Sequence, residues 1–268
     1  MACLATPTGV LGEAAEDSEA AENNPPDTEP EPTSTLKTKK LSSVTLQSGI
    51  GKEWLSAEGG VSEFKGASNL GGLFAKGSRN ITPEWKLELW AAAHNFTVVE
   101  LGENETKVEQ TKYLRLRTRA VGFYNPPKKF GISESHQILV GVGLETFKMP
   151  VLVLSDEDTG EAELASRNVI GPYIGIQYLK QTSDEHFFGA EFGFVPSVYG
   201  DARKGMSANG FAYWRFSFTE AIFSELGLAI RQDSLNHDIS CPSSTVCRKK
   251  GYASSQILQG RMGIGCDF

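Results

Sequence analysis

The residues of this sequence whose type and spacing most clearly indicate a chemical role are charged residues at alternate positions. The stretch "YLRLRTRAVGF" places Arg115, Arg117 and Arg119 at every second position. In a β-strand such residues share one face, because successive side chains point to opposite sides. Guanidinium groups bind carboxylates in a planar, two-pronged geometry. The row therefore predicts ion pairs with acids on neighbouring strands, while Leu114 and Leu116 point the other way.

Candidate catalytic residues are few. The sequence has four histidines, and the one that stands beside an acid in a suitable place is His237, next to Asp238 in the expected loop 233–254. Activation of water for hydrolysis needs such a base, held by further carboxylates. Ser135 and His136 are adjacent, so strand alternation sends their side chains to opposite faces. We therefore predict that the protein is not an enzyme, with a hydrolase acting on lipid or peptide at an outer rim as the alternative.

Metal and cofactor motifs are absent from the sequence. The segment "SDEDTGEAE" at 155–163 contains five carboxylates but lacks the regular spacing of a calcium-binding loop, so we interpret it as a solvated acidic loop. The sequence contains no P-loop, dinucleotide fingerprint or zinc spacing. We predict no catalytic residue, no cofactor and no metal.

A second polar loop, 233–254, carries two further candidates. Cys241 and Cys247 enclose "PSSTV" and are a candidate disulfide in an oxidising compartment, with two free thiols as the alternative. The basic run "CRKKG" at 247–251 follows directly. In an external loop its side chains would contact lipopolysaccharide phosphates, and a plain solvated loop is the alternative.

Charge and composition divide the chain into two parts. Of 268 residues with a formal net charge of −7, residues 1 to 36 carry eight acids and no base, so the remainder is close to neutral. This balance gives no indication of nucleic-acid binding. The segment 1–40 is also rich in Pro and poor in apolar residues, so it is expected to be a disordered tail. Residues 41–268 are expected to form one domain.

Period-two alternation dominates the second part and predicts an all-β domain. No apolar run is long enough for a membrane helix. About ten strands are expected, or eight if the first two are misassigned. Tight turns are expected at "RNITPEW", "KQTSDEH" and "SFTEAIF", with long polar loops at 155–167, 197–207 and 233–254. The expected strands cover 53–65, 69–79, 84–101, 110–124, 136–154, 168–181, 185–196, 208–219, 221–232 and 255–268.

The two faces of these strands differ in a way that favours a closed transmembrane barrel. In "ILQGRMGIGCDF" one face is apolar throughout, whereas the other mixes charged residues with glycine. Glycine weakens a solvated strand but makes room inside a narrow barrel. Aromatic residues also gather near strand ends, as in an interfacial girdle: Trp85, Phe123, Tyr124, Phe194, Phe218, Phe223 and Phe268. A soluble carrier barrel with leucines inside is the alternative.

On this interpretation the charged faces meet in the lumen and close it. An arginine facing lipid at the bilayer midplane costs roughly 2–4 kcal/mol, so the arginine row must point inward. Expected pairs join Glu88 to the arginine row, Glu191 to Arg215, Glu225 to Arg215 or Arg261, and Arg261 to Glu58. The predicted lumenal network consists of Glu58, Lys86, Glu88, Arg115, Arg117, Arg119, Glu145, Glu191, Arg215, Glu225, Arg231 and Arg261.

Three segments resemble the small bacterial outer-membrane β-barrel proteins of the OmpA/OmpW-like group. "SRNITPEWKLEL" is similar to their periplasmic hairpins, "YWRFSFTEAIFSELGLA" to a turn between two of their strands, and the last strand ends in Phe268 after alternating apolar residues. Cys266 and Asp267 depart from the usual ending. The resemblance covers about 53–268.

The resemblance implies an architecture and a location rather than an activity. It implies an antiparallel up-and-down barrel in the outer membrane of a Gram-negative bacterium, with both termini in the periplasm. Phe268 would then belong to the signal that the barrel-insertion machinery reads. Expected partners are outer-membrane lipid and lipopolysaccharide, with the protein as a monomer. We predict a structural or surface-interaction role through the long loops, with a narrow anion-favouring passive pore as the alternative.

Overall fold

The computed structural model describes residues 42–60, 62–101, 112–126, 136–154, 162–196, 199–200, 204–239 and 248–268. These residues form strands and turns, and none of them belongs to a helix long and apolar enough to cross a membrane. The strands are β1 (Ser42–Gly60), β2 (Ser62–Asn80), β3 (Trp85–Leu101), β4 (Lys112–Tyr124), β5 (His136–Leu154), β6 (Ala162–Gln181), β7 (His186–Val195), β8 (Tyr199–Gly200), β9 (Lys204–Ser217), β10 (Ile222–Asp238) and β11 (Arg248–Asp267).

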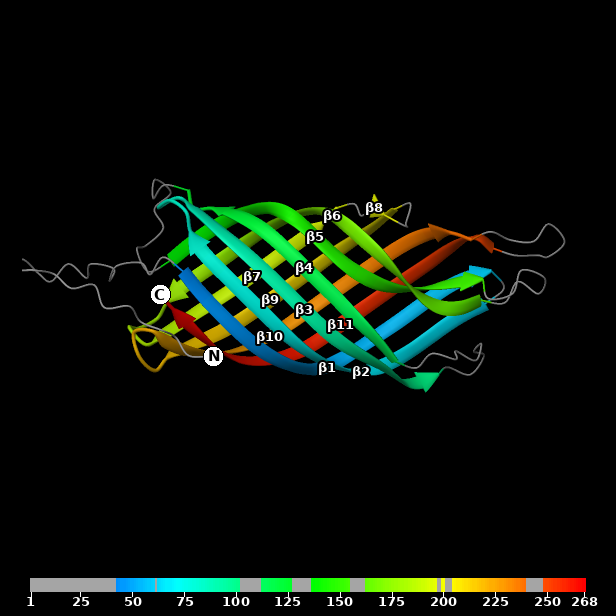
Figure 1. Cartoon of the computed structure of the whole chain (residues 1–268), viewed down its shortest axis with the longest axis horizontal. Helices are drawn as coiled ribbons and strands as arrows, with labels where there is room; N and C mark the ends of the chain where they lie inside the picture. The colour runs from blue at the N-terminus through cyan, green and yellow to red at the C-terminus, as the bar shows by residue number, and fades with distance from the viewer. Residues whose placement is uncertain are drawn as a thin grey trace, which may run out of the picture.

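The ten long strands close into an antiparallel up-and-down barrel (Figure 1). Each pairs with its sequence neighbours, except that β7 pairs directly with β9. The first and last strands close the seam, with Ser43 opposite Asp267 and Lys52 opposite Leu258. The two-residue β8 pairs with β6 beyond the end of β7. The predicted fold class is confirmed, with ten strands rather than eight.

The first hairpin lies elsewhere than the sequence indicates. The expected strand at 53–65 is wrong, because the chain reverses between β1 and β2, and Gly60 adopts a φ of 61° there. A left-handed backbone of this kind is readily adopted by glycine, which lacks a Cβ. Several strands also extend further than expected toward the same end of the barrel, as β10 does by continuing to Asp238.

Three tight turns lie at the opposite end, where the two ends of the barrel sequence also meet (Figure 1). In each turn a hydroxyl accepts hydrogen bonds from two following backbone N–H groups: Thr82 from Glu84 and Trp85, Ser183 from Glu185 and His186, and Thr219 from Ala221 and Ile222. Such hydroxyl turns are compact and need no special backbone conformation. Ser42 and Phe268 exchange two backbone hydrogen bonds of 3.0 Å beside them.

Alternation places apolar side chains on the outside and charged ones inside. On β4, Leu114 and Leu116 are 56% and 45% exposed, whereas Arg115 and Arg117 are each 5% exposed. This arrangement contradicts a soluble carrier barrel with leucines in its core and matches a transmembrane barrel, whose outer band contacts hydrocarbon. Among the expected girdle residues, Trp85, Phe218 and Phe268 are exposed, but Phe123 and Phe223 are buried inside.

The end opposite the tight turns is filled by an apolar core. Strand β5 pairs with β4 only as far as Phe147, opposite Arg117, and continues with β6 to Leu154. Beyond Phe147 it contacts β1 and β11, which are not its neighbours in the sheet. Figure 1 shows the β5–β6 hairpin curving toward β1 and β2 at this end. The fully buried side chains of the resulting core include Phe64, Met149, Val151, Leu152 and Leu235.

Candidate functional site

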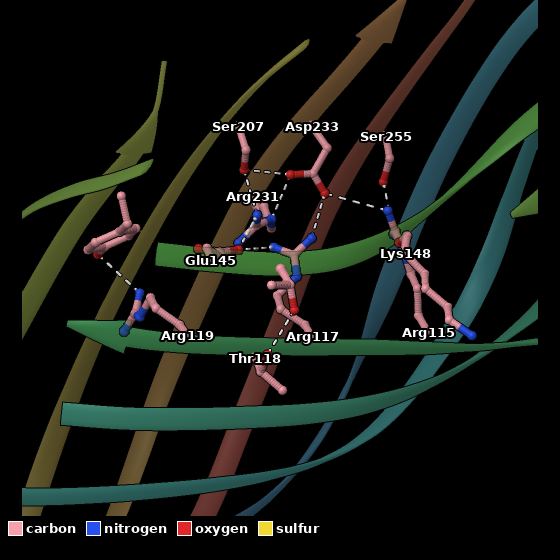
Figure 2. Close-up of polar contacts among 12 residues, drawn as sticks. Arg115, Arg117, Thr118, Arg119, Glu145, Lys148, Ser207, Arg231, Asp233 and Ser255 are labelled. Atoms are coloured by element: carbon pink, nitrogen blue, oxygen red, sulfur yellow. Dashed lines mark hydrogen bonds and ion pairs between the residues drawn. The ribbon is translucent and has the colours of Figure 1, made fainter. Parts of the chain in front are cut away.

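The charged residues of the lumen form the candidate site, and a group of six, which we call the central cluster, spans it. Asp233 on β10 lies 2.9 Å from the Arg117 guanidinium of β4 and 2.7 Å from that of Arg231, its neighbour on the same face. Figure 2 shows Asp233 between these arginines and Ser207, which donates a hydrogen bond of 2.6 Å. The central cluster consists of Glu53, Arg115, Arg117, Glu145, Arg231 and Asp233.

The other members connect opposite walls of the barrel. Glu145 on β5 lies 3.2 Å from Arg117 and 2.6 Å from Arg231. Arg115 pairs with Glu53 of β1 and lies 3.5 Å from Asp233. Its Nε also donates a 2.9 Å hydrogen bond to the carbonyl of Lys148, where β5 has left β4. Buried charges persist only when they are paired and hydrogen-bonded, and three arginines here share three carboxylates.

A second group, the lower cluster, surrounds Glu88 and Glu191 nearer the tight turns. Arg119 lies 2.6 Å from Glu191 and 3.2 Å from Glu88. The ammonium groups of Lys76 and Lys86 lie 3.3 and 3.4 Å from Glu88. Tyr173 donates a 2.8 Å hydrogen bond to Glu191 and accepts one of 3.0 Å from Arg119. Three cations here share two carboxylates.

Two more arginines stand apart from these clusters. Arg215 makes a 2.7 Å ion pair with Glu225 and reaches Asp267 at 3.5 Å, and its guanidinium lies 3.6 Å above the Phe223 ring. Arg261 has no carboxylate within ion-pair distance among the described residues. Its Nε donates to the Gln259 side chain, and its guanidinium lies 3.9 Å from the centre of the Phe74 ring.

The structure places eleven of the twelve predicted network residues on the inner face, and Glu58 is the exception. It lies on the outward side of β1, opposite Tyr252 and on the same face as Trp54. Arg261 therefore does not pair with Glu58. Glu191 pairs with Arg119 rather than Arg215, whereas the Glu88–Arg119 and Glu225–Arg215 pairs are present.

Sequence reasoning missed several charged residues of the lumen, among them Glu53, Asp233 and Lys76. Asp233 follows Arg231 by two positions and shares its face, but the expected strand stopped at 232, one residue short. Glu53 was hidden by the misplaced first strand, whose inward face was taken to include Glu58. Lys76 stands two residues after Phe74 on the same face of β2, and this spacing was the available signal.

Inward glycines accommodate aromatic rings rather than the long charged side chains expected. A Cβ added to Gly175 would lie 2.7 Å from the Tyr173 ring, and one added to Gly141 would lie within 2.6 Å of the Phe123 ring. Both contacts are far closer than carbon atoms tolerate. The glycines thus position Tyr173, which in turn orients Arg119 and Glu191 of the lower cluster.

His237, the candidate base at the rim, is turned inward. The outer face of β10 is apolar through Ile230 and polar from Gln232 to Asp238, so His237 lies beyond the apolar band. Its side chain is 2% exposed, and Nε2 donates a 2.7 Å hydrogen bond to the Leu152 carbonyl. Burial lowers the pKa of this imidazole, although the bond to Leu152 opposes the shift. His237 thus fastens the β5 end rather than facing a substrate.

Three sequence candidates lie outside the described residues. These are the Cys241–Cys247 pair, the acidic segment 155–161 and Ser135. Among the residues that the structure describes, no cluster of His, Cys, Asp and Glu is arranged to hold a metal ion.

Comparison with known proteins finds no matching family model and no similar curated protein. Similar solved structures include the outer membrane protease OmpT from Escherichia coli, at 10% identity over 87% of this chain and 98% of that one, with a TM-score of 0.48. The outer membrane protein OprG from Pseudomonas aeruginosa is 14% identical over 85% of this chain and 97% of that one, with a TM-score of 0.36. An outer membrane channel from Pseudomonas putida F1 is 10% identical over 90% of this chain and 100% of that one, with a TM-score of 0.40. These structures are all bacterial outer-membrane proteins.

Proposed function

We propose that the protein is an integral outer-membrane β-barrel that acts as a closed scaffold for its long loops, rather than as a pore or an enzyme. The observation that carries this proposal is the central cluster. Its side chains come from β1, β4, β5 and β10 and meet across the lumen, with each arginine held by at least two carboxylates. Ions would have to disrupt these pairs to pass.

The apolar core at the loop end supports the same proposal. Phe64, Leu152 and Leu235 are fully buried there, and the β5 end is attached by the hydrogen bonds of Arg115 to Lys148 and of His237 to Leu152. A ten-stranded barrel leaves an interior that side chains can fill. The remaining place for recognition is the outside: hydrocarbon along the strands, and lipopolysaccharide or a cell-surface partner at the loops.

A periplasmic position for both ends of the chain is part of the proposal. Ser42 and Phe268 are joined at the tight-turn end, and short periplasmic turns with longer external loops are usual in such barrels. The aromatic Phe268 is then presented to the barrel-insertion machinery. A monomer is proposed because each of the ten long strands pairs with a neighbour on both sides, which closes the sheet without a second copy.

Cell fractionation followed by electrophoresis of unheated and heated samples tests the class. An outer-membrane protein whose migration changes on heating is expected, and recovery in the cytosol without detergent would refute the proposal. A peptide tag inserted at 158 should be accessible to antibody on intact cells, whereas one inserted at 184, in a tight turn, should be accessible only after permeabilisation. The reverse pattern would contradict the proposed orientation.

Planar-bilayer recording separates the scaffold from the anion-favouring pore. The closed lumen predicts no steady conductance from the wild-type protein. Asp233→Ala, which removes a carboxylate that three arginines share, is the variant in which channel events are expected if any appear. Steady anion-selective channels from the wild type would establish the pore instead.

A further inference from the structure

A small cavity of about 50 Å³ lies in the lumen beside both clusters. Its wall contains the side chains of six cationic residues and of one acid, Glu191. The cationic residues are Lys76, Arg115, Arg117, Arg119, Arg231 and Arg261. A water molecule needs roughly 10–15 Å³ of such space, so the cavity accommodates about four water-sized groups.

The ion pairs around this cavity leave positive charge uncompensated. The central cluster is balanced, with three arginines and three carboxylates. The lower cluster has Lys76, Lys86 and Arg119 against Glu88 and Glu191, a surplus of one. Arg261 adds a second, because the described residues give it no carboxylate partner. Arg215, which pairs with both Glu225 and Asp267, belongs to a group with one negative charge in excess, so the surplus over all these groups is one positive charge.

Arg261 cannot lose this charge by releasing a proton, since guanidinium remains protonated in proteins. The rings of Phe74, at 3.9 Å, Phe211, at 5.1 Å, and Trp90, at 5.6 Å, stabilise it from their faces. These ring contacts stabilise the cation but supply no negative charge to balance it. The side of Arg261 that faces the cavity is where a counter-charge can approach.

We propose that the cavity is a binding site for a small tetrahedral oxyanion such as phosphate or sulfate. Its negative charge offsets the surplus, and its four oxygen atoms match the four water-sized groups that the cavity accommodates. Arginine is well matched to such an anion because its planar fork donates two parallel hydrogen bonds. The anion would give Arg261, which has no carboxylate within ion-pair distance among the described residues, a counter-charge inside the lumen. This site goes beyond the scaffold role and does not depend on it.

Equilibrium dialysis of the full-length protein tests the site. The protein is folded into detergent micelles with radiolabelled phosphate present throughout, at fixed ionic strength maintained with a large organic salt. Saturable binding of about one phosphate per barrel is expected, and excess unlabelled sulfate should displace it. Absence of saturable binding up to millimolar phosphate would overturn the proposal. Displacement by chloride as effective as by sulfate would overturn the assignment to an oxyanion.

Two variants locate the site, with heat-modifiable migration as the check of folding. Arg261→Gln should weaken phosphate binding about tenfold or more, because a charge-assisted contact is lost. Arg215→Gln, which removes a lumenal arginine that is paired with Glu225 and lies outside the cavity wall, should change phosphate binding less than about twofold. Equal binding by Arg261→Gln and the wild type would refute the location.

Asn209→Asp keeps the proposal falsifiable if Arg261→Gln does not fold. Asn209 lines the cavity, and aspartate has nearly the same shape, so this change places a carboxylate where the anion is proposed to bind. The variant should fold and should have lost phosphate binding, because its own negative charge compensates the surplus. Undiminished phosphate binding in Asn209→Asp would contradict the site.

Discussion

Removal of the Asp233 carboxylate should destabilise the barrel more than any other single loss of an acid in the lumen. This carboxylate lies 2.7 Å from Arg231, 2.9 Å from Arg117 and 3.5 Å from Arg115, and it accepts a hydrogen bond from Ser207. Asp233→Ala leaves three buried arginines with two carboxylates. Breaking a buried ion pair by removing one partner costs about 3–5 kcal/mol, so Asp233→Ala should lower the free energy of unfolding by this amount.

Urea unfolding of the refolded protein in lipid vesicles measures this loss. The matched control is Asp238→Ala, which removes an exposed acid from the outer face of the same strand and should change the free energy of unfolding by less than about 1 kcal/mol. Equal effects of the two substitutions would refute the reasoning, because burial and multiple pairing would then contribute nothing.

A double-mutant cycle sharpens the test. Adding Arg231→Ala to Asp233→Ala removes one cation together with the acid, so the double variant should be less destabilised than the sum of the single changes by about 1–3 kcal/mol. The Arg231–Asp233 distance of 2.7 Å makes this coupling strong. Strict additivity would mean that the two charges do not compensate each other in the folded barrel.

Three further predictions concern other parts of the barrel. Gly175→Ala should cost about 1–3 kcal/mol by displacing Tyr173, whereas Gly77→Ala, where an added Cβ meets nothing within 4 Å, should be neutral or slightly stabilising in the same unfolding assay. Leu228→Arg, on the apolar outer face of β10, should cost roughly 2–4 kcal/mol in vesicles, and a neutral result would place that face outside hydrocarbon. Because the pKa of His237 is lowered in the folded protein, the unfolded chain binds a proton at this imidazole at higher pH than the folded chain does. The contribution of neutral His237 to the free energy of unfolding is therefore complete above about pH 6.5 and decreases as the pH falls below that value. His237→Gln should remove this component from the pH profile, and identical profiles for variant and wild type would contradict it.

Alternation was sufficient to predict which side of most strands is charged. Leu114, Arg115, Leu116 and Arg117 are assigned to their faces by spacing alone, because strand side chains alternate strictly. The tight turns were predictable for a similar reason: each combines a hydroxyl residue with polar neighbours between two alternating runs. These local rules extend over a few residues and need no knowledge of the rest of the fold.

Ion-pair partners could not be predicted in the same way, because they depend on register across the whole barrel. A shift of one residue moves a side chain to the other face, and Glu58 lies on the outward face of β1 although it was assigned to the lumen. The departure of β5 from β4 after Phe147 is also a tertiary effect. Nothing in the local sequence of β5 indicates that Met149 and Leu152 belong to the apolar core at the end of the barrel opposite the tight turns.

The assignment of inside and outside is the central claim, and spin-label accessibility along β10 tests it most directly. Single cysteines at Leu226, Gly227, Leu228 and Ala229, introduced after the native cysteines are replaced by serine, would carry a nitroxide in vesicle-embedded protein. We expect high collision rates with oxygen, which dissolves in lipid, at 226 and 228 and low rates at 227 and 229. Uniform accessibility along the four positions, or higher collision rates with a water-soluble nickel chelate than with oxygen at 226 and 228, would contradict the account.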